Sequence, residues 1–468
     1  MIFSIQYSLL VLHTFRWQAF SGYYILMIGK IEELHVVSMG VGDVASLPES
    51  ALHAIHSADV ILGAEHHFTS IAELECKGTK ELYATPFSLV KQQVLSFEGC
   101  IVVLASGDSL FFGIGSWINN LLVEDSDSET TSLQPVFHPN ISSIQAACHL
   151  IGKPWQQLTV LSAHGRPLAD IKGKLVNHCF YGLFTDKHSQ PFAVANTLIN
   201  AGFEQSTLWV CESIGTDQQR VRQYKARDLV EQGDSSADSI ENEFHPLHVT
   251  LFETAGAGNI LPEFPGILDT AFSTDGDKKG SGLLTKREVR INILSLLQPT
   301  ADDIGWDVGA GCGGVSVEWA RWNPKGKVYS IEYHPDRLPH LRENQQRFGV
   351  GGNLQIIEGR APDALLELPR PQKVFVGGSG GELAGILSFC WDKLTGNGKL
   401  VIACVTENNK HRALEFVEQL PNDSYEMDIS QLSVSRGDSI ANQLILRPQL
   451  PVLLIAITKN LTACEVKA

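Results

Sequence analysis

Apolar runs that end in glycine turns, followed by apolar residues at helical spacing, recur along the chain. The run "LHVVSM" at 34–39 ends in "GVGD", and a helical pattern follows at 47–58. The run "IVVLAS" at 101–106 ends in "GDSLFFGIG" before another helical stretch. Apolar strands that alternate with helices are typical of parallel α/β sheets, which bind ligands at the carboxyl ends of their strands. The pattern therefore predicts an α/β fold.

Two turn-rich segments interrupt this pattern. Residues 231–244 are acidic and polar, which predicts a surface loop. Residues 253–282 contain two prolines and many glycines, which indicates a domain junction. A chain of 468 residues also exceeds what one hydrophobic core usually supports. We expect an extension outside the fold at 1–30, a first domain at 31–257, a linker at 258–282 and a second domain at 283–468.

The stretch "WDVGAGCGGVSVEWA" at 306–320 reads as a strand, a glycine turn and a helix. Its glycines match both the G-x-G-x-x-G turn of dinucleotide-binding domains and the tighter G-x-G-x-G turn of S-adenosylmethionine (SAM) enzymes. Glu332, at the end of the next apolar run, suits the ribose of either cofactor. The β-branched runs at 425–437 and 451–459, with no helix evident between them, predict a terminal antiparallel pair. That ending favours a doubly wound SAM-dependent methyltransferase.

The charge balance argues against nucleic acid as a partner. Lys+Arg 36 and Asp+Glu 52 give a net charge of -16, whereas phosphate binding requires basic surface. The 9 cysteines include no C-x-x-C pair, which suits reduced thiols in a cytoplasmic protein and indicates neither a zinc site nor a disulfide framework. The histidines show no metal-ligand spacing, so the sequence predicts no metal.

The N-terminal stretch is apolar, but His13, Arg16 and Gln18 interrupt it before it is long enough to span a membrane. It also lacks the basic start and the small-residue cleavage site of a secretory signal. We therefore expect residues 1–26 to be an extension outside the fold and no membrane partner. An interfacial helix is the alternative interpretation.

Several longer sequence motifs in the chain identify a protein family more specifically than the glycine turn does. The words "LLTKREVR", "EGRAPDAL", "VFVGGSGGEL" and "VSRG" resemble the decarboxylating corrin methyltransferases of cobalamin biosynthesis over nearly all of 260–460. The words "VSMGVGD", "VVLASGDSLFFGIG", "NISSIQAA", "LSAHGR" and "CESIGTDQQRV" resemble the tetrapyrrole methylases over 34–255. Both together, in this order, resemble the precorrin-6Y C5,15-methyltransferase (decarboxylating) family.

This resemblance implies a tetrapyrrole-methylase-type α/β region followed by a doubly wound SAM-methyltransferase domain. The N-terminal domain would methylate carbon 5 of a precorrin. The C-terminal domain would methylate carbon 15 and decarboxylate the ring C acetate. SAM would be the cofactor of both, and the resemblance also implies a homo-oligomer. The sequence identifies no catalytic acid or base.

Matching these words residue by residue gives two candidate cofactor sites. In the second domain the site would comprise Thr285, Gly309, Ala310, Gly311, Cys312, Gly313, Glu332 and Ala361. In the first domain it would comprise Val41, Gly42, Asp43, Ser106, Gly107, Asp108, Phe111, Ser142, Ser143 and Thr185. Val41 and Ser109 stand where the family usually has proline, so we expect looser loops and weaker SAM binding in the first domain.

Precorrins carry acetate and propionate arms, so guanidinium partners are expected even on an acidic protein. Arg436, in a predicted loop between two strands, is the first candidate, and a surface ion pair is the alternative for each arginine. The backbone of Gly378, Ser379 and Gly380 would form a flat wall against the macrocycle, unless Ser379 simply caps a helix. The arginine candidates are Arg166, Arg287, Arg290, Arg360 and Arg436.

Three other functions are consistent with parts of the sequence. The second domain could be an NAD-dependent oxidoreductase, although the antiparallel ending argues against it. The first domain could be an inactive module that binds the macrocycle, which the changes at Val41 and Ser109 keep open. A nucleic-acid methyltransferase is disfavoured by the acidic charge.

Overall fold

The computed structural model describes residues 19–20, 23–24 and 31–461, apart from gaps at 43, 125–133, 164, 166, 187, 235–243, 259–260 and 263. The described residues form two compact units. One is drawn from 1–157, 210–222 and 245–251, and the other from 158–209, 223–244 and 252–468. The predicted extension at 1–30 lies outside the described residues except for a short antiparallel pair, β1 (Ala19–Phe20) and β2 (Tyr23–Tyr24).

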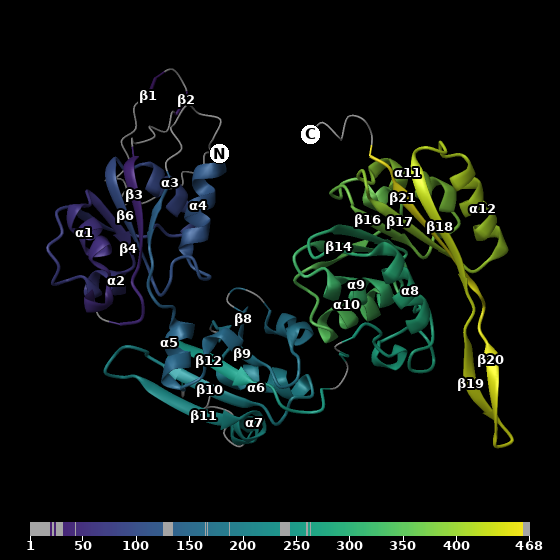
Figure 1. Ribbon diagram of the computed structural model, residues 1–468, viewed down its shortest axis with the longest axis horizontal. Coiled ribbons are helices and arrows are strands. Elements are labelled where there is room, and N and C mark those ends of the chain that lie inside the picture. The colour runs from purple at the N-terminus through teal and green to yellow at the C-terminus, as the bar shows by residue number, and fades with distance from the viewer. Residues whose placement is uncertain are drawn as a thin grey trace, which may run out of the picture. The chain divides into compact units, whose positions relative to one another are not determined.

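The first unit contains a parallel sheet covered by helices on both faces. Its elements are β3 (Ile31–Ser38), α1 (Glu49–Ser57), β4 (Val60–Gly63), α2 (Glu65–Ser70), β5 (Thr79–Leu82), α3 (Val90–Leu95), β6 (Gly99–Ala105), α4 (Ile114–Glu124), β7 (Val136–His138) and α5 (Ser143–Leu150). The sheet order is β5-β4-β6-β3-β7, and Figure 1 labels its strands β3, β4 and β6. Alternate residues face opposite sides. Val37 and Leu104 therefore pack with α1 and α2, whereas Val36 and Val103 pack with α3 and α4.

A second five-stranded sheet follows in the chain, in the order β11-β10-β12-β9-β8. The elements of this region are β8 (Leu158–Ser162), β9 (Phe180–Phe184), α6 (Pro191–Asn200), β10 (Thr207–Glu212), β11 (Arg220–Lys225), α7 (Ala226–Asp234) and β12 (His248–Glu253). The acidic segment at 231–244, predicted as a loop, begins inside α7, and its central part lies outside the described residues.

The third sheet has seven strands and belongs to the second unit. Its region contains α8 (Arg287–Leu297), β13 (Ile304–Val308), α9 (Gly314–Trp322), β14 (Lys327–Glu332), α10 (Leu338–Arg347), β15 (Leu354–Glu358), β16 (Lys373–Val376), α11 (Leu383–Lys393), β17 (Lys399–Cys404), α12 (Glu407–Glu418), β18 (Tyr425–Leu432), β19 (Ser435–Ile440), β20 (Gln443–Pro448) and β21 (Val452–Lys459). The order is β15-β14-β13-β16-β17-β21-β18. Strands β13 to β17 are parallel, whereas β21 runs antiparallel between β17 and β18. The predicted terminal antiparallel pair is confirmed.

The chain order of this sheet creates a crevice. After β13 the chain builds outward through β14 and β15, and then returns to place β16 on the other side of β13. Adjacent connections therefore leave the carboxyl end of β13 in opposite directions, which is where doubly wound sheets bind ligands. Helices cover both faces, with Ile293 of α8 and Trp319 of α9 on one side and Leu387 of α11 and Phe416 of α12 on the other.

The segment predicted as a linker is partly folded. Ile267 and Phe272 are buried in the same core cluster as α8 and α9, and Asp269–Ala271 forms a turn of 3-10 helix. Other 3-10 turns lie at Val44–Ser46, Phe87–Leu89, Trp155–Gln157, Leu168–Lys174 and Asp363–Leu365. Across the described ranges, no helix combines the length and the apolar character needed to cross a membrane.

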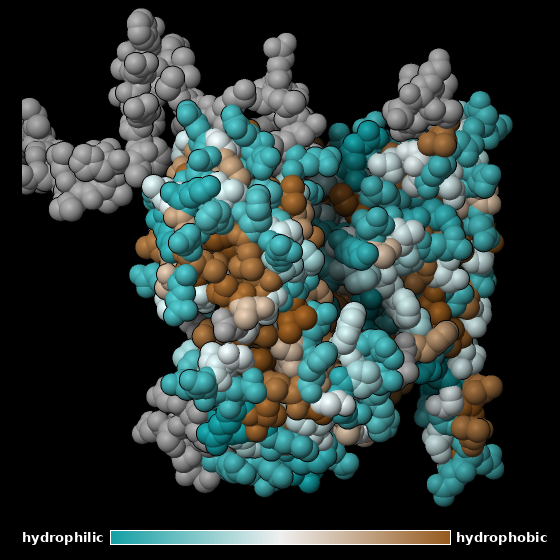
Figure 2. All heavy atoms as spheres, turned by 60° about the vertical axis from the view of Figure 1, so that its left-hand side comes forward, coloured by the Kyte–Doolittle hydropathy of each residue, from teal (hydrophilic) through white to brown (hydrophobic). Residues whose placement is uncertain are grey.

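A β-hairpin stands where the sequence predicts a loop around Arg436. Strands β19 and β20 pair antiparallel, and their turn at Ala441 and Asn442 has positive φ at both residues, the geometry that matches the twist of a two-residue hairpin. The hairpin extends away from the third sheet, and exposed apolar side chains gather on it (Figures 1 and 2). These include Leu444 and Leu446.

Candidate active sites

A cavity of about 440 Å³ opens at the crevice of the third sheet, at the carboxyl ends of β13, β14 and β16. Parallel strands bring their carboxyl ends to one edge, so residues far apart in sequence meet there. The predicted site residues that line the cavity are Thr285, Gly309, Ala310, Gly311, Glu332, Arg360, Ala361, Gly378, Ser379 and Gly380.

The glycine turn after β13 is required by close packing. Gly309 has φ +75°, and a Cβ there would lie 2.6 Å from the backbone of Gly378. Gly311 has φ +59°, and its Cβ would lie 2.6 Å from the carbonyl oxygen of Leu283. Non-glycine residues avoid this φ region, so the turn needs glycine at both positions. The result is a bare backbone edge on the cavity wall.

Two residues of the turn face the protein interior. Cys312 is fully buried, and burial raises the pKa of its thiol to about 11. Gly313 caps α9 with φ +86°, and its Cβ would meet Leu341. Neither residue is among those that line the cavity, so Cys312 and Gly313 have packing roles in this structure, and their cofactor contact stays a prediction.

Glu332 ends β14 beside the glycine turn and is 2% exposed. Its Oε2 accepts a hydrogen bond from the N–H of Gly311 at 2.8 Å, and its Oε1 accepts from the N–H groups of Tyr333 and His334, both at 2.9 Å. A carboxylate offers about four acceptor positions. Three are occupied by backbone donors, which leaves one on Oε2 for a hydroxyl group in the cavity.

A buried acid, Asp307, lies in β13 two residues before Gly309, where the glycine turn begins. Asp307 of β13 is fully buried and accepts a hydrogen bond from Ser316, whose Oγ in turn accepts from Ser330 at 2.6 Å. Burial, assisted by the nearby charge of Glu332, raises the pKa of Asp307 to about 7. Asp307 was not predicted as a site residue, because an acid near a strand end gives no sign of its burial in the sequence.

The other wall of the cavity carries cationic and aromatic groups. The guanidinium of Arg360 lies 5.0 Å from the ring centre of Tyr333 and donates to the carbonyl oxygen of Gly380 at 2.9 Å. Arg337 reaches within 3.7 Å of Glu332. Ser379 is not a helix cap, since Glu382 holds that position in α11. Tyr333 and Arg337 were not predicted, although both follow a strand that ends in an acid.

In the first unit, three predicted loops lie together at the carboxyl ends of β3, β6 and β7. Gly40 and Gly107 form a bridge with two backbone hydrogen bonds of 3.0 Å. A Cβ on Gly107 would lie 3.7 Å from the backbone of Ser142 and Ser143, at the start of α5. Ser142 caps this helix by accepting from the N–H of Gln145.

Polar groups surround this loop cluster. Ser106 Oγ is 3.0 Å from Nε2 of His66 and 2.8 Å from Nε2 of His67. Burial and the neighbouring His66 lower the pKa of His67 to about 4, so its ring is neutral near pH 7. Asp108 Oδ1 accepts from the N–H of Leu110 and holds the turn that places Phe111. The two histidines were not predicted as site residues.

Comparison with known proteins covers both regions. Residues 33–230 match the family model described as Tetrapyrrole (Corrin/Porphyrin) Methylases, and residues 271–459 match the model described as Precorrin methyltransferase domain. A Precorrin-6Y C(5,15)-methyltransferase [decarboxylating] from Sinorhizobium sp is 32% identical over 431 residues, which are 91% of this chain and 96% of that protein.

The chain belongs to this family of decarboxylating precorrin-6Y C5,15-methyltransferases.

Two further similar proteins each match less than half of the chain. A probable cobalt-precorrin-6B C(15)-methyltransferase (decarboxylating) from Methanothermobacter thermautotrophicus is 35% identical over 171 residues, 36% of this chain and 86% of that protein. A crystal structure of a precorrin-6y C5,15-methyltransferase from Geobacter metallireducens GS-15 is 32% identical, covers 42% of this chain and 98% of that chain, and has a TM-score of 0.38. The relative that covers 91% of this chain confirms the resemblance read from the sequence at the level of the family.

Other contacts hold the loops at Val41 and Ser109, where the resemblance read from the sequence leads to an expectation of proline. Ser109 is buried, and its N–H donates to Ser38 Oγ at 2.9 Å. Ser38 Oγ in turn donates to Ser109 Oγ at 3.0 Å. The carbonyl of Val41 packs so closely on Gly215 that a Cβ there would lie 1.7 Å from it. Side-chain hydrogen bonds and close packing hold these loops in place of ring constraints.

Arg290 is a correction to the predicted substrate contacts. It is fully buried, and its guanidinium contacts Asp269 at 2.7 Å and Glu318 at 3.3 Å and donates to the carbonyl oxygens of Thr285 and Ile267. These four acceptors occupy the guanidinium, so Arg290 holds the start of α8 in place and does not reach a ligand.

The arginine candidates Arg436 and Arg287 form ion pairs outside the cavity. Arg436 lies in strand β19, not in a loop, and pairs with Asp269 and Glu288. Arg287 pairs with Glu288 at 3.2 Å and is 39% exposed. Neither lines the cavity.

Thr185 follows β9 in the second unit. Asp43 and Arg166 lie outside the described residues.

Proposed function

We propose that this chain is a bifunctional enzyme that uses SAM to methylate a precorrin at carbon 5 and carbon 15 and removes carbon dioxide from the ring C acetate. The observation that carries the proposal is the relative of this activity that matches 91% of the chain and therefore both regions at once. The glycine turn and Glu332 at the crevice of the third sheet support it independently.

The two activities are assigned to the two matched regions. Residues 31–257 form the domain that methylates carbon 5, and residues 283–468 form the domain that methylates carbon 15 and decarboxylates. A relative named for the carbon 15 reaction alone, which matches 171 residues of this chain, supports a division of the two reactions between separate regions. Because Ile267 and Phe272 pack into the C-terminal core, we place the ordered part of the predicted linker with the C-terminal domain.

The residues of the C-terminal cavity fit SAM. The backbone edge of Gly309 and Gly311 admits a close approach of the ligand, and the remaining acceptor position of Glu332 suits a ribose hydroxyl. When bound, SAM would supply a methyl group on a sulfonium, which a nucleophilic carbon of the substrate attacks in line while S-adenosylhomocysteine leaves. The protein then contributes by positioning the two reactants and by stabilising the charges that change in the transition state. A neutral Asp307, as its raised pKa allows, leaves Glu332 as the anionic acceptor beside the turn.

The substrate is expected to lie against the Gly378–Gly380 wall. Arg360 is half exposed beside this wall and is the arginine best placed to receive a carboxylate arm. Electrons from the broken bond to carbon dioxide can enter the conjugated macrocycle, so positioning of the acetate is the main requirement. We assign no catalytic acid or base.

The N-terminal loop cluster is proposed as the second SAM site. It includes Gly40, Gly107, Asp108 and the capped start of α5 at Ser142, where unpaired N–H groups are available. The alternative is a macrocycle-binding module without methyl transfer. We do not expect nucleic acid as a partner. We expect a cytoplasmic location and a homo-oligomer.

The proposal is tested with precorrin-6Y and SAM labelled with 13C in its methyl group. Wild-type protein should place label on carbons 5 and 15, as read by NMR. Gly309→Ala should lose the carbon 15 signal and retain carbon 5. Gly107→Val, which puts a β-branched residue at φ +62°, should do the reverse. Label on carbon 15 alone in wild type would support the binding-module alternative, and no label on either carbon would refute the proposal.

A further inference from the structure

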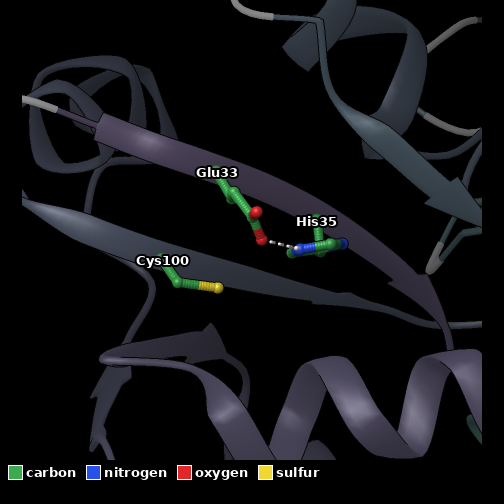
Figure 3. Close-up of side chains that lie close together, drawn as sticks. All are labelled: Glu33, His35 and Cys100. Carbon is green, nitrogen blue, oxygen red and sulfur yellow. Dashed lines mark hydrogen bonds and ion pairs between the residues drawn. The ribbon is translucent and has the colours of Figure 1, made fainter.

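Three metal-ligating side chains meet at the opposite end of the first sheet from the loop cluster. Glu33 and His35 belong to β3, and Cys100 belongs to β6. One carboxylate oxygen, one imidazole nitrogen and the sulfur all lie within 4.8 Å of one another. Figure 3 shows the three side chains directed toward one another from the two neighbouring strands.

Strand register brings these residues together. Glu33 pairs with Cys100, and His35 pairs with Val102, in the parallel ladder of β3 and β6. Residues paired in this way, and residues two apart on one strand, face the same side of a sheet. The ladder shifts between Ile31 and Glu33, so the three side chains lie where the regular pairing of the two strands begins.

The donor set has the chemistry of a zinc site. Thiolate, imidazole and carboxylate are the three ligand types that Zn²⁺ accepts in proteins. Zinc bonds of about 2.0–2.3 Å place neighbouring ligand atoms roughly 3.3–3.8 Å apart. Glu33 Oε2 and His35 Nε2 are already 3.1 Å apart. Glu33 is 67% exposed, so its carboxylate is free to rotate toward the metal.

The histidine is oriented by a chain of partners behind it. His35 Nδ1 lies 3.1 Å from Nε2 of His138, and His138 Nδ1 lies 3.2 Å from Ser50 Oγ. His138 is 5% exposed. Metal-bound histidines usually have their second ring nitrogen held by such a partner. Here the partner engages Nδ1, which directs Nε2 toward Glu33 and Cys100.

The backbone at Cys100 is held as well. Its N–H donates to Asp59 Oδ2 at 2.8 Å, and Gly99, with φ +81°, packs so tightly on Asp59 that a Cβ would lie 2.3 Å from Oδ2. The carboxylate of Asp59 therefore holds the backbone from which the thiol projects, and it adds negative charge near a bound cation.

We propose that Glu33, His35 and Cys100 bind one Zn²⁺ ion, with water completing the tetrahedral shell, and that this ion fastens β3 to β6. Binding involves no electron transfer, and the proton of the Cys100 thiol passes to solvent as the sulfur binds the metal. The site lies at the amino ends of strands whose carboxyl ends carry the candidate SAM loops, so it is a structural site of the first unit.

The test uses the full chain stripped of metal with a chelator. Zinc is then titrated in competition with a chromophoric chelator. Wild type should bind one tightly held zinc per chain, and its thermal midpoint should rise with zinc. Cys100→Ser should weaken zinc binding by more than ~100-fold, whereas His138→Gln should weaken it ~10- to 100-fold, as expected for loss of an orienting partner. The control Cys76→Ser, a partly buried thiol elsewhere in the unit, should bind as wild type does.

Cobalt gives a readout that does not depend on a variant folding correctly. Co²⁺ bound to wild-type protein should show a thiolate-to-cobalt charge-transfer band and the visible bands of a tetrahedral ion. Methyl transfer should persist in the metal-free protein below its lowered thermal midpoint. Absence of a tightly held zinc, absence of the thiolate band, or equal zinc affinity in Cys100→Ser would each overturn the proposal.

Discussion

Replacement of Glu332 by glutamine tests the cofactor site of the C-terminal domain with the smallest change in shape. Glutamine keeps one acceptor oxygen but replaces the other with an N–H₂ donor. In this structure both oxygens of Glu332 receive backbone N–H groups, from Gly311 on one side and from Tyr333 and His334 on the other. The new donor must therefore oppose a backbone donor on one side.

The size of the effect follows from the bonds that are lost. A hydrogen bond to a charged acceptor contributes about 1.5–3 kcal/mol, and about 1.4 kcal/mol corresponds to a factor of ten in an equilibrium constant. Loss of one ribose contact should weaken SAM binding at this site by roughly 10- to 150-fold. Displacement of the Gly311 turn would add to this loss.

Calorimetric titration of the full chain with SAM measures this effect. Wild type should bind two SAM per chain, and Glu332→Gln should weaken one of the two sites and leave the other unchanged. Glu358→Gln is the matched control, because Glu358 is the register partner of Glu332 on β15 and is exposed. If Glu332→Gln remains folded and binds both SAM molecules as tightly as the control, the assignment of Glu332 is wrong.

Three further predictions concern stability. Arg290→Met leaves the buried carboxylate of Glu318 without its cation and should cost about 3–5 kcal/mol in denaturant unfolding, whereas the half-exposed Arg287→Met should cost less than about 1 kcal/mol. The pKa of His67 is about 4 in the folded protein against 6.5 normally, so the unfolded chain takes up the proton first. Stability should therefore fall as the pH drops from 6.5 to 4, by up to about 3 kcal/mol, and His67→Gln should remove that part of the slope measured at pH 7 and pH 4.5. Ser109→Pro introduces the residue expected from the resemblance but removes the N–H whose hydrogen bond Ser38 accepts. This change should lower the free energy of unfolding by about 1–3 kcal/mol. A gain in stability would contradict the role given to this hydrogen bond.

The sequence predicted those parts of the C-terminal fold that depend on local pattern. An apolar run, a turn rich in glycine and a helical pattern are written consecutively at 306–320, and β13, the turn and α9 lie there. The acid at 332 ends β14 as expected. The parallel order then places these local features at one edge, which explains why most predicted C-terminal residues line one cavity.

Features that depend on distant partners were not predicted. Arg290 reads as one position on a helix face, and only packing shows that Glu318, 28 positions later, takes its charge. The hairpin at 435–448 carries exposed apolar residues on short strands, which periodicity alone does not separate from a loop. Glu33 and Cys100 meet only because of the register of β3 with β6, so ligand spacing along the chain gave no sign of a metal site.

The mass of the product formed from precorrin-6Y and SAM by purified wild-type protein tests the central claim most directly. The account predicts a gain of two methyl groups and the loss of one carbon dioxide. A single methyl group with decarboxylation would mean that the N-terminal domain does not transfer methyl groups. Unchanged precorrin in the presence of bound SAM would contradict the assignment of the substrate.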